Sequence, residues 1–287
     1  MSSSILFLGT GGDAIVVGKQ LRASGGILLY VNSQLLLLDP GPGALVRLKE
    51  QGINVGALDG ILVSHGHLNH SHDVPAVLSA MTYGGLDRKG VIIGEESFLG
   101  RQKSRRKALA DVPMIEKSPL DVGEDNFFSM AEKVLVASEG KKEDVGGVSI
   151  SATPCVHSCP AVGFLITAED ATIGYTGDTE YFEGMDKHYR NADILIINCK
   201  NPSGIREHFS LNADDAVLLV QKVRPSLAVL THFGIKMLEL DPFKIAADIQ
   251  KATKVQTLVA FDNMSVTPEN YLVPKNQKSL DAYLKPS

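Results

Sequence analysis

The sequence predicts a mixed α/β protein in which two β-sheets pack face to face and helices cover their outer sides. Short apolar runs bounded by glycine, proline or aspartate recur along the whole chain, as expected for buried strands. Segments with the apolar spacing of amphipathic helices lie between some of these runs, in both halves of the chain. Strands and helices of this kind bury their apolar faces best when the sheets form the centre and the helices lie outside.

The predicted strands form two series. The first covers residues 5–8, 27–31, 35–38, 60–64 and 91–93, and the second covers 134–137, 148–153, 162–167, 172–175, 193–197, 227–231 and 256–261. The predicted helices cover residues 44–51, 74–81, 97–110, 213–223 and 242–252. The helix at 213 has a start signal, because Ser210 or Asn212 can cap it while Asp214 and Asp215 lie in its positively polarised first turn.

Residues 1–287 are predicted to form one domain. A chain of this length buries most of its apolar surface, and no segment has the composition of a linker between two domains. The stretch 94–145 is charged and punctuated by glycine, which predicts an irregular insertion. It includes a basic cluster made of Arg101, Lys103, Arg105, Arg106 and Lys107. We interpret this cluster either as a solvated helix face or as a docking patch for an anionic substrate.

Composition and charge exclude several classes of protein. The net charge of −5 argues against a surface built wholly for nucleic acid. The amino terminus lacks the basic and apolar segments of a secretory signal, and no apolar run is long enough to span a membrane. The 3 cysteines have no CxxC spacing, which fits reduced thiols. These features predict a cytoplasmic protein without membrane association.

The strongest chemical signal is the loop that follows the predicted strand at 60–64. It reads Ser-His65-Gly-His67-Leu-Asn69-His70. Three imidazoles so close together cannot all be buried without partners at low cost, and metal binding explains them together. Residues at i and i+2 of an extended loop point the same way, so His65 and His67 can converge on one ion while His70 faces a second.

Three further polar residues, His157, Asp178 and His232, each follow a predicted strand. A buried strand that ends in a polar residue delivers that side chain to the edge of its sheet, where loops on a rigid scaffold assemble a site. Cys155 and Cys159 flank His157. We interpret both thiols as small buried side chains rather than ligands, since the imidazoles already supply enough donors.

These motifs resemble the metallo-β-lactamase superfamily. The resemblance rests on the loop from His65 to His70, on the later His157, Asp178 and His232, and on four short segments: Leu-Gly-Thr-Gly-Gly at 8–12, Asp-Pro-Gly-Pro-Gly at 39–43, Tyr-Thr-Gly-Asp-Thr at 175–179 and Leu-Thr-His-Phe at 230–233. It implies a four-layer αββα sandwich. The glycines at 9–12 are expected to form a tight turn and not a phosphate-binding loop, because no helix is predicted after them.

The resemblance also implies a site for two divalent metal ions. One ion would be held by His65, His67 and His157, and the second by His70 and His232, with Asp178 bridging both ions and acting in catalysis. Zinc is expected, with manganese or iron as alternatives, and a shared water would be acidified into a hydroxide nucleophile.

Asn69 departs from the family pattern, which has aspartate at this position. An asparagine offers an amide oxygen but neither charge nor basicity, so affinity for the second metal should fall. Asp73 is interpreted either as a carboxylate that orients an imidazole or as an acid at a helix amino terminus. His72 is expected to be an exposed loop residue rather than a ligand.

A second segment, Glu207-His208-Phe-Ser210, resembles the His-x-Ser/Thr segment of the phosphodiesterase branch, which includes enzymes of the ribonuclease Z type. The resemblance implies that His208 contacts the phosphate or protonates the leaving group, and a histidine suits that role near neutral pH. The alternative is a surface histidine before a helix. Only a short hairpin lies between His157 and Asp178, where transfer-RNA processing members carry a long arm, so specificity for transfer RNA is not expected.

The predicted function is hydrolysis of a small-molecule or nucleotide phosphodiester, with nucleic acid as a further substrate class and a homodimer as the expected family assembly. The same site chemistry also serves esters, thioesters and lactones, and these remain an alternative. A third hypothesis is iron-dependent oxygen chemistry on a thiol. The alternative from outside the enzymes is a superfamily member that binds nucleic acid or a protein partner without catalysis. Asn69 and the basic cluster motivate this alternative.

Overall fold

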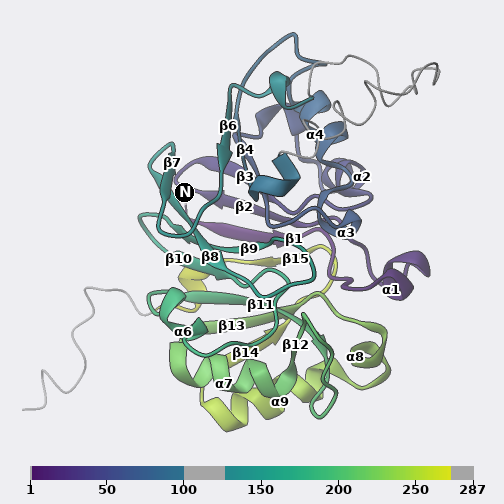
Figure 1. Cartoon of the computed structure of the whole chain (residues 1–287), viewed down its shortest axis with the longest axis vertical. Coiled ribbons are helices and arrows are strands. Elements are labelled where there is room, and N and C mark those ends of the chain that lie inside the picture. Colours follow the sequence, from purple (N-terminus) through teal and green to yellow (C-terminus); the bar gives the residue numbers. More distant parts are fainter. Residues whose placement is uncertain (1, 100–126, 273–287) are drawn as a thin grey trace, which may run out of the picture.

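The computed structural model describes residues 2–99 and 127–272, and these form two β-sheets with helices on their outer sides (Figure 1). The first is a 7-stranded sheet in the order β15-β1-β2-β3-β4-β5-β6. Its strands are β1 (Ser4–Phe7), β2 (Ile27–Val31), β3 (Gln34–Leu38), β4 (Gly60–Val63), β5 (Val91–Gly94), β6 (Lys133–Val136) and β15 (Met264–Val266).

The second is an 8-stranded sheet in the order β14-β13-β11-β10-β9-β8-β7, with β12 paired to β11. Its strands are β7 (Lys142–Val145), β8 (Val148–Pro154), β9 (Val162–Thr167), β10 (Thr172–Tyr175), β11 (Ile194–Asn201), β12 (Leu211–Asn212), β13 (Leu227–Thr231) and β14 (Gln256–Val259). The helices are α1 (Ala14–Gly18), α2 (Ala44–Glu50), α3 (Leu68–Ser71), α4 (Val74–Met81), α6 (Met185–His188), α7 (Ala213–Val223), α8 (Ile235–Glu239) and α9 (Pro242–Thr253), with short 3-10 turns at Val55–Ala57, Phe127–Met130 and Pro268–Asn270.

Three apolar clusters define the layers. The central cluster lies between the sheets and joins Leu29 and Leu36 of the first sheet to Phe164 and Ile196 of the second. A second cluster packs α7 and α9 on the outer face of the second sheet, and a third packs α2 and α4 on the outer face of the first. The arrangement confirms the predicted four-layer αββα sandwich, with helices at the two ends of the stack in Figure 1.

Parallel pairing places several strand ends at one edge of the sandwich. Strands β3, β4 and β5 are parallel in the first sheet, and β10, β11 and β13 are parallel in the second. Strand β8 runs antiparallel to β9, which runs antiparallel to β10, so β8 ends on the same side as β10. The loops that follow β3, β4, β8, β10 and β13 can therefore meet at this edge.

The prediction that no helix follows the glycines at 9–12 is wrong. Asp13 caps α1 by accepting a hydrogen bond from the backbone N–H of Val16 at 2.7 Å. The helix has 5 residues and only one fully buried side chain, Val16, so it carries no apolar period for a sequence to reveal. Another part of the backbone still passes close to these glycines, because a Cβ on Gly9 would lie 2.3 Å from the backbone nitrogen of Gly25.

The described part of the stretch 94–145 contributes regular structure, since β6 lies at one edge of the first sheet and β7 at one edge of the second. Most of the predicted helix at 97–110, including the basic cluster Arg101–Lys107, lies outside the described residues. No helix among the described residues is long and apolar enough to cross a membrane.

Candidate metal centre

Three imidazoles form what we call the first group: His65 and His67 from the loop after β4, and His157 from the loop after β8. The Nδ1 atom of His67 lies 3.0 Å from Nε2 of His65 and 3.1 Å from Nε2 of His157. His65 is fully buried, and the other two are partly exposed. The structure thus brings three ring nitrogens of the candidate ligands to one point from two sheets.

The opposite ring nitrogens of His65 and His157 contact oxygen acceptors. Nδ1 of His65 lies 3.0 Å from the hydroxyl of Ser64, and Nδ1 of His157 lies 3.0 Å from the carbonyl oxygen of Phe209. The Ser64 hydroxyl donates its own proton to Asp39 at 2.6 Å, so its lone pair is left to accept from His65. These contacts place the ring protons on Nδ1 and leave both Nε2 lone pairs directed at the convergence point.

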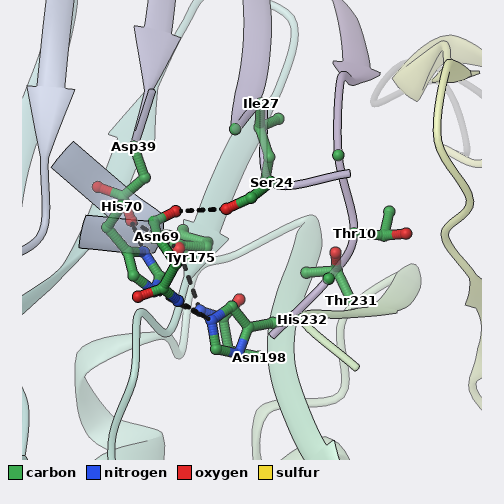
Figure 2. Close-up of a pocket in the computed structure, with 13 residues that line it drawn as sticks. Thr10, Ser24, Ile27, Asp39, Asn69, His70, Tyr175, Asn198, Thr231 and His232 are labelled. Atoms are coloured by element: carbon green, nitrogen blue, oxygen red, sulfur yellow. Dashed lines mark hydrogen bonds and ion pairs between the residues drawn. The ribbon is translucent and has the colours of Figure 1, made fainter. Parts of the chain in front are cut away.

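The second group consists of His70, Asp178 and His232. Nε2 of His70 lies 3.0 Å from Nε2 of His232, and Figure 2 shows the two rings directed toward each other. The Asp178 carboxylate spans the pair, with one oxygen 3.4 Å from Nε2 of His70 and the other 3.3 Å from Nε2 of His232. His65 adjoins this group as well, since its ring centroid is 4.3 Å from that of His70.

Charge within the second group explains the protonation of the metal-free protein. Burial lowers the pKa of His70, but the carboxylates of Asp178 and Asp39 outweigh burial and raise it to about 10. Burial likewise opposes the charge of Asp178, but the imidazoles of His232 and His70 hold its pKa well below the ordinary value. Burial lowers the pKa of His232 to about 4. Burial and the neighbouring His70 lower the pKa of His65 still further.

Asp39 contacts the surroundings of both groups, and the sequence interpretation did not single it out. It follows β3 with a left-handed backbone, φ 50°, and its carboxylate accepts hydrogen bonds from the Ser64 backbone N–H at 2.7 Å and the Ser64 hydroxyl at 2.6 Å. It also accepts from Nδ1 of His70 at 2.9 Å and from the Tyr175 hydroxyl at 2.7 Å. Asp39 therefore orients ligand imidazoles of both groups, directly for His70 and through Ser64 for His65. Its sequence signal was an acid placed directly after a wholly apolar run and before a turn.

Asn69 lies at the second group, as its place in the loop predicts. Its side-chain nitrogen is 3.2 Å from Nε2 of His232, and its backbone carbonyl accepts from the Ser24 hydroxyl at 2.8 Å (Figure 2). Asp73 contacts neither group. Its carboxylate accepts from the backbone N–H of Leu45 at 3.2 Å and pairs with the exposed His72, so it holds the start of α2.

Comparison with known proteins supports the resemblance seen in the sequence. A family model described as "Beta-lactamase superfamily domain" matches residues 35–233, which is more than half of the chain. The chain belongs to the metallo-β-lactamase superfamily. The matched residues run from the start of β3 to the residue after His232, so they include both groups.

Relatives of this superfamily member cover most of its length. An uncharacterized protein of Methanocaldococcus jannaschii is 29% identical over 240 residues, covering 83% of this chain and 85% of the relative. A protein named Ribonuclease Z from Bradyrhizobium is 24% identical over 309 residues, covering 91% and 99%. A protein named as a metal-dependent hydrolase from Bacillus mycoides is 25% identical over 237 residues, covering 79% and 90%. The family and these relatives support a metal-dependent hydrolase.

A solved structure shows the same fold. The metallo-β-lactamase fold protein YhfI from Bacillus subtilis superimposes with a TM-score of 0.73 and 17% identity, and the match covers 93% of this chain and 99% of that one. At this identity the likeness concerns the fold, and it agrees with the αββα sandwich described above.

The structure corrects one prediction about the cysteines of this metallo-β-lactamase member, because Cys159 is partly exposed and not buried. Cys159 lies at the first group, where its sulfur is 3.7 Å from Nε2 of His67 and joins His65, His67 and His157 as a set able to surround an ion. Nothing in the sequence pattern separates it from Cys155, whose thiol donates to the Thr176 carbonyl at 3.3 Å. The turn after His157 brings Cys159 back over the imidazoles, and only the fold determines that turn.

A cleft of about 510 Å³ opens in front of the two groups. His67, Asn69, His157 and Asp178 line its floor, and its walls come from α1, from Leu68, and from the segment Lys200 and His208–Ser210. The His208 side chain is 90% exposed, and its Nδ1 lies 3.6 Å from the Glu180 carboxylate. His208 thus lies in the cleft but outside both groups, where it can reach a bound molecule.

Proposed function

We propose that this protein is a phosphodiesterase whose site holds two divalent metal ions, with zinc as the expected metal and manganese or iron as alternatives. The observation that carries the proposal is the placement of two ligand groups side by side, with Asp178 clustered with His65 of the first group as well as with His70 and His232 of the second, and a cleft in front of them. A mononuclear site would not need the second pair of imidazoles, and a purely structural site would not need a cleft.

The donor set fits such ions. Imidazole nitrogens suit zinc, and those of His65 and His157 present lone pairs because their other nitrogens meet oxygen acceptors. We assign His65, His67 and His157 to the first ion, and His70, His232 and Asn69 to the second, with Asp178 shared. Bound ions of this kind acidify a water molecule and neutralise charge that develops on a phosphate.

The chain's own residues would bind the substrate and supply a proton. Lys200 lines the cleft and gives it a cation, and it is held in place by Glu207 at 3.1 Å. His208 extends into solvent and lines the same cleft. Glu180 steadies this wall, because it pairs with His208 and accepts from the backbone N–H of Phe209 at 3.1 Å. We propose that His208 protonates the leaving oxygen and that Lys200 binds a phosphate oxygen.

Two observations favour a phosphodiester over a carboxylic ester. The cleft presents Lys200 and His208, which suit an anionic substrate, and one full-length relative is named Ribonuclease Z. The hairpin between His157 and Asp178 consists of β9, β10 and their short connection. We therefore propose a small-molecule or nucleotide phosphodiester rather than transfer RNA as the substrate.

A substrate panel tests the reaction class. The metal-loaded protein should hydrolyse bis(p-nitrophenyl) phosphate at least about tenfold faster than p-nitrophenyl acetate, a thioester or a lactone, each relative to its own buffer rate. Faster turnover of a carbonyl substrate would overturn the choice of phosphodiester. If the chain retains less than about one metal equivalent and hydrolyses none of these substrates, the result would favour the alternative that the protein binds nucleic acid or a protein partner without catalysis.

The role of His208 has its own test. His208→Ala should lower kcat for a dinucleotide phosphodiester, whose departing alkoxide must be protonated, by about 10²-fold or more, as expected for loss of a general acid, with metal content unchanged. His72→Ala is the matched control, because His72 is also exposed and ion-paired but does not line the cleft. Equal activity in the two variants would remove His208 from the reaction.

A further inference from the structure

The imidazoles of the site share a pattern that singles out Cys159. For His65, His70 and His157, one ring nitrogen faces a ligand group and the other contacts an oxygen: the Ser64 hydroxyl, the Asp39 carboxylate and the Phe209 carbonyl. For His67 the roles of the two nitrogens are reversed, since Nδ1 faces the first group and Nε2 points away. The atom 3.7 Å from that Nε2 is the sulfur of Cys159.

We infer that Cys159 is a positioning residue for His67, accepting a hydrogen bond from its Nε2–H and so holding the ring in the form whose Nδ1 binds the first ion. This inference rests on the proposed metal site. A distance of 3.7 Å is within hydrogen-bonding range for sulfur, whose van der Waals radius exceeds that of oxygen. A ligand imidazole requires such an outer partner to fix its tautomer and its orientation.

The position of the sulfur distinguishes this role from direct ligation. A fourth ligand would lie on the Nδ1 side of His67, about 2.3 Å from an ion that His65 and His157 also bind. The Cys159 sulfur instead approaches the far nitrogen of the ring. The sulfur lies close enough to ring nitrogens of His65 and His157 to belong to the same cluster. Its contact with His67, however, is made to the nitrogen that faces away from the other imidazoles.

Chain geometry explains why a thiol can act here. Cys159 is partly exposed and lies two residues beyond His157, before Pro160 and the start of β9 at Val162. The short turn returns the chain toward the loop after β4, where His67 lies. Cys155 enters the same region from β8 but bonds to a backbone carbonyl of the β10 end, so it provides an internal comparison.

Metal affinity is the direct test. Cys159→Ala should weaken binding of the first zinc ion by about 10–100-fold in competition with a chromophoric chelator, the range for loss of an outer partner. Cys159→Ser, whose hydroxyl can accept the same hydrogen bond, should recover most of that loss. Cys155→Ala is the matched control and should bind the first ion as the unaltered chain does. Circular dichroism of each variant shows that it is folded.

Cobalt substitution separates the outer role from ligation. The cobalt-loaded chain should lack a thiolate-to-cobalt charge-transfer band in the near ultraviolet, while Cys159→Ala should shift the visible ligand-field bands. A charge-transfer band that disappears in Cys159→Ala, or equal zinc affinity in Cys159→Ala and Cys155→Ala, would overturn the inference. An unaltered chain that binds neither zinc nor cobalt would instead overturn the proposed metal site itself, so the two failures are distinguishable.

Discussion

The first and second groups lie side by side, yet they differ in what surrounds their imidazoles. The first group is bordered by neutral acceptors, the Ser64 hydroxyl and the Phe209 carbonyl, together with the Cys159 sulfur. The second contains one carboxylate, Asp178, and contacts another, Asp39. The first group should therefore select an ion through its nitrogen donors and their orientation, and the second through charge.

The protonation of the metal-free protein reflects the same difference. His65 stays neutral because burial and nearby imidazoles disfavour its charge, whereas His70 is protonated because two carboxylates contact it. The second group must therefore release a proton before it can bind an ion, while the first presents neutral donors. Variants in the second group should act mainly by removing charge.

The largest effect is expected for Asp178→Asn. Because Asp178 contacts both imidazoles of the second group, the variant should lose the second ion and at least about 100-fold in phosphodiesterase activity, equivalent to several kcal/mol of charge stabilisation. Elemental analysis and a steady-state assay measure the two losses. Asp170→Asn, which alters a carboxylate bonded to Ser3, is the matched control. Retention of both ions in Asp178→Asn would contradict a charge-selected second site.

Asp39→Asn should come next in size and should affect both groups. The change removes the charged acceptor of Ser64, His70 and Tyr175, so we expect a loss of about 3–5 kcal/mol in the unfolding free energy of the metal-free protein. Metal affinity should fall by about 10–100-fold. Urea denaturation and chelator competition measure these effects. Tyr175→Phe is the matched control, because it removes one hydrogen-bond donor to Asp39 and leaves the carboxylate. A loss of unfolding free energy in Tyr175→Phe as large as that in Asp39→Asn would show that the negative charge of Asp39 is unimportant.

The parts of the fold that the sequence could predict are those defined by local pattern. Strands β2, β9, β10 and β13 have the predicted bounds, since each is an apolar run closed by turn residues. Helix α7 begins at its predicted residue because Asn212 and Asp215 form a capping box. Strand β15 was missed, because its three residues have no pattern of their own and pair with β1 from the far end of the chain.

The candidate site was predictable where a side chain follows a buried strand, as for His157, Asp178 and His232. It was not predictable where only tertiary contact assigns the role. Asp39 acts through residues 25, 31 and 136 positions away, and Cys159 meets a histidine 92 positions away. Gly12 is another example, because a Cβ there would lie 2.0 Å from the carbonyl oxygen of His232, and only the folded chain brings them together.

Asn69→Asp should have a smaller effect than either loss of a carboxylate, and in the opposite direction. The new charge would lie where the Asn69 amide is 3.2 Å from Nε2 of His232, so affinity for the second ion should rise by about tenfold or more. Calorimetric titration with zinc should show the second binding step tighten while the first is unchanged. Tightening of both steps equally, or of neither, would contradict the view that only the second group is selected by charge.

The pH dependence of stability in the metal-free protein takes its sign from the same two groups. His70 has a pKa raised from 6.5 to about 10, so its contribution is fully present below pH 6.5 and is lost as pH rises toward 10. His232 has a pKa lowered from 6.5 to about 4, so the folded state loses stability as pH falls from 6.5 toward 4, and His65 acts in the same direction. Tm should therefore be highest near pH 6.5.

Below about pH 8 the alkaline side of that profile comes from His70, because the raised pKa values of the buried Cys155, Cys199, Tyr175 and Tyr189 lower stability only at higher pH. His70→Gln should abolish the decline in Tm between pH 6.5 and about pH 8, because glutamine does not titrate, while the acidic decline caused by His65 and His232 should remain. Scanning calorimetry of chelator-treated protein across this range measures both arms. A Tm that rises steadily with pH in the unaltered chain would show that the Asp39 and Asp178 carboxylates do not hold a proton on His70, and the electrostatic difference between the groups would then disappear.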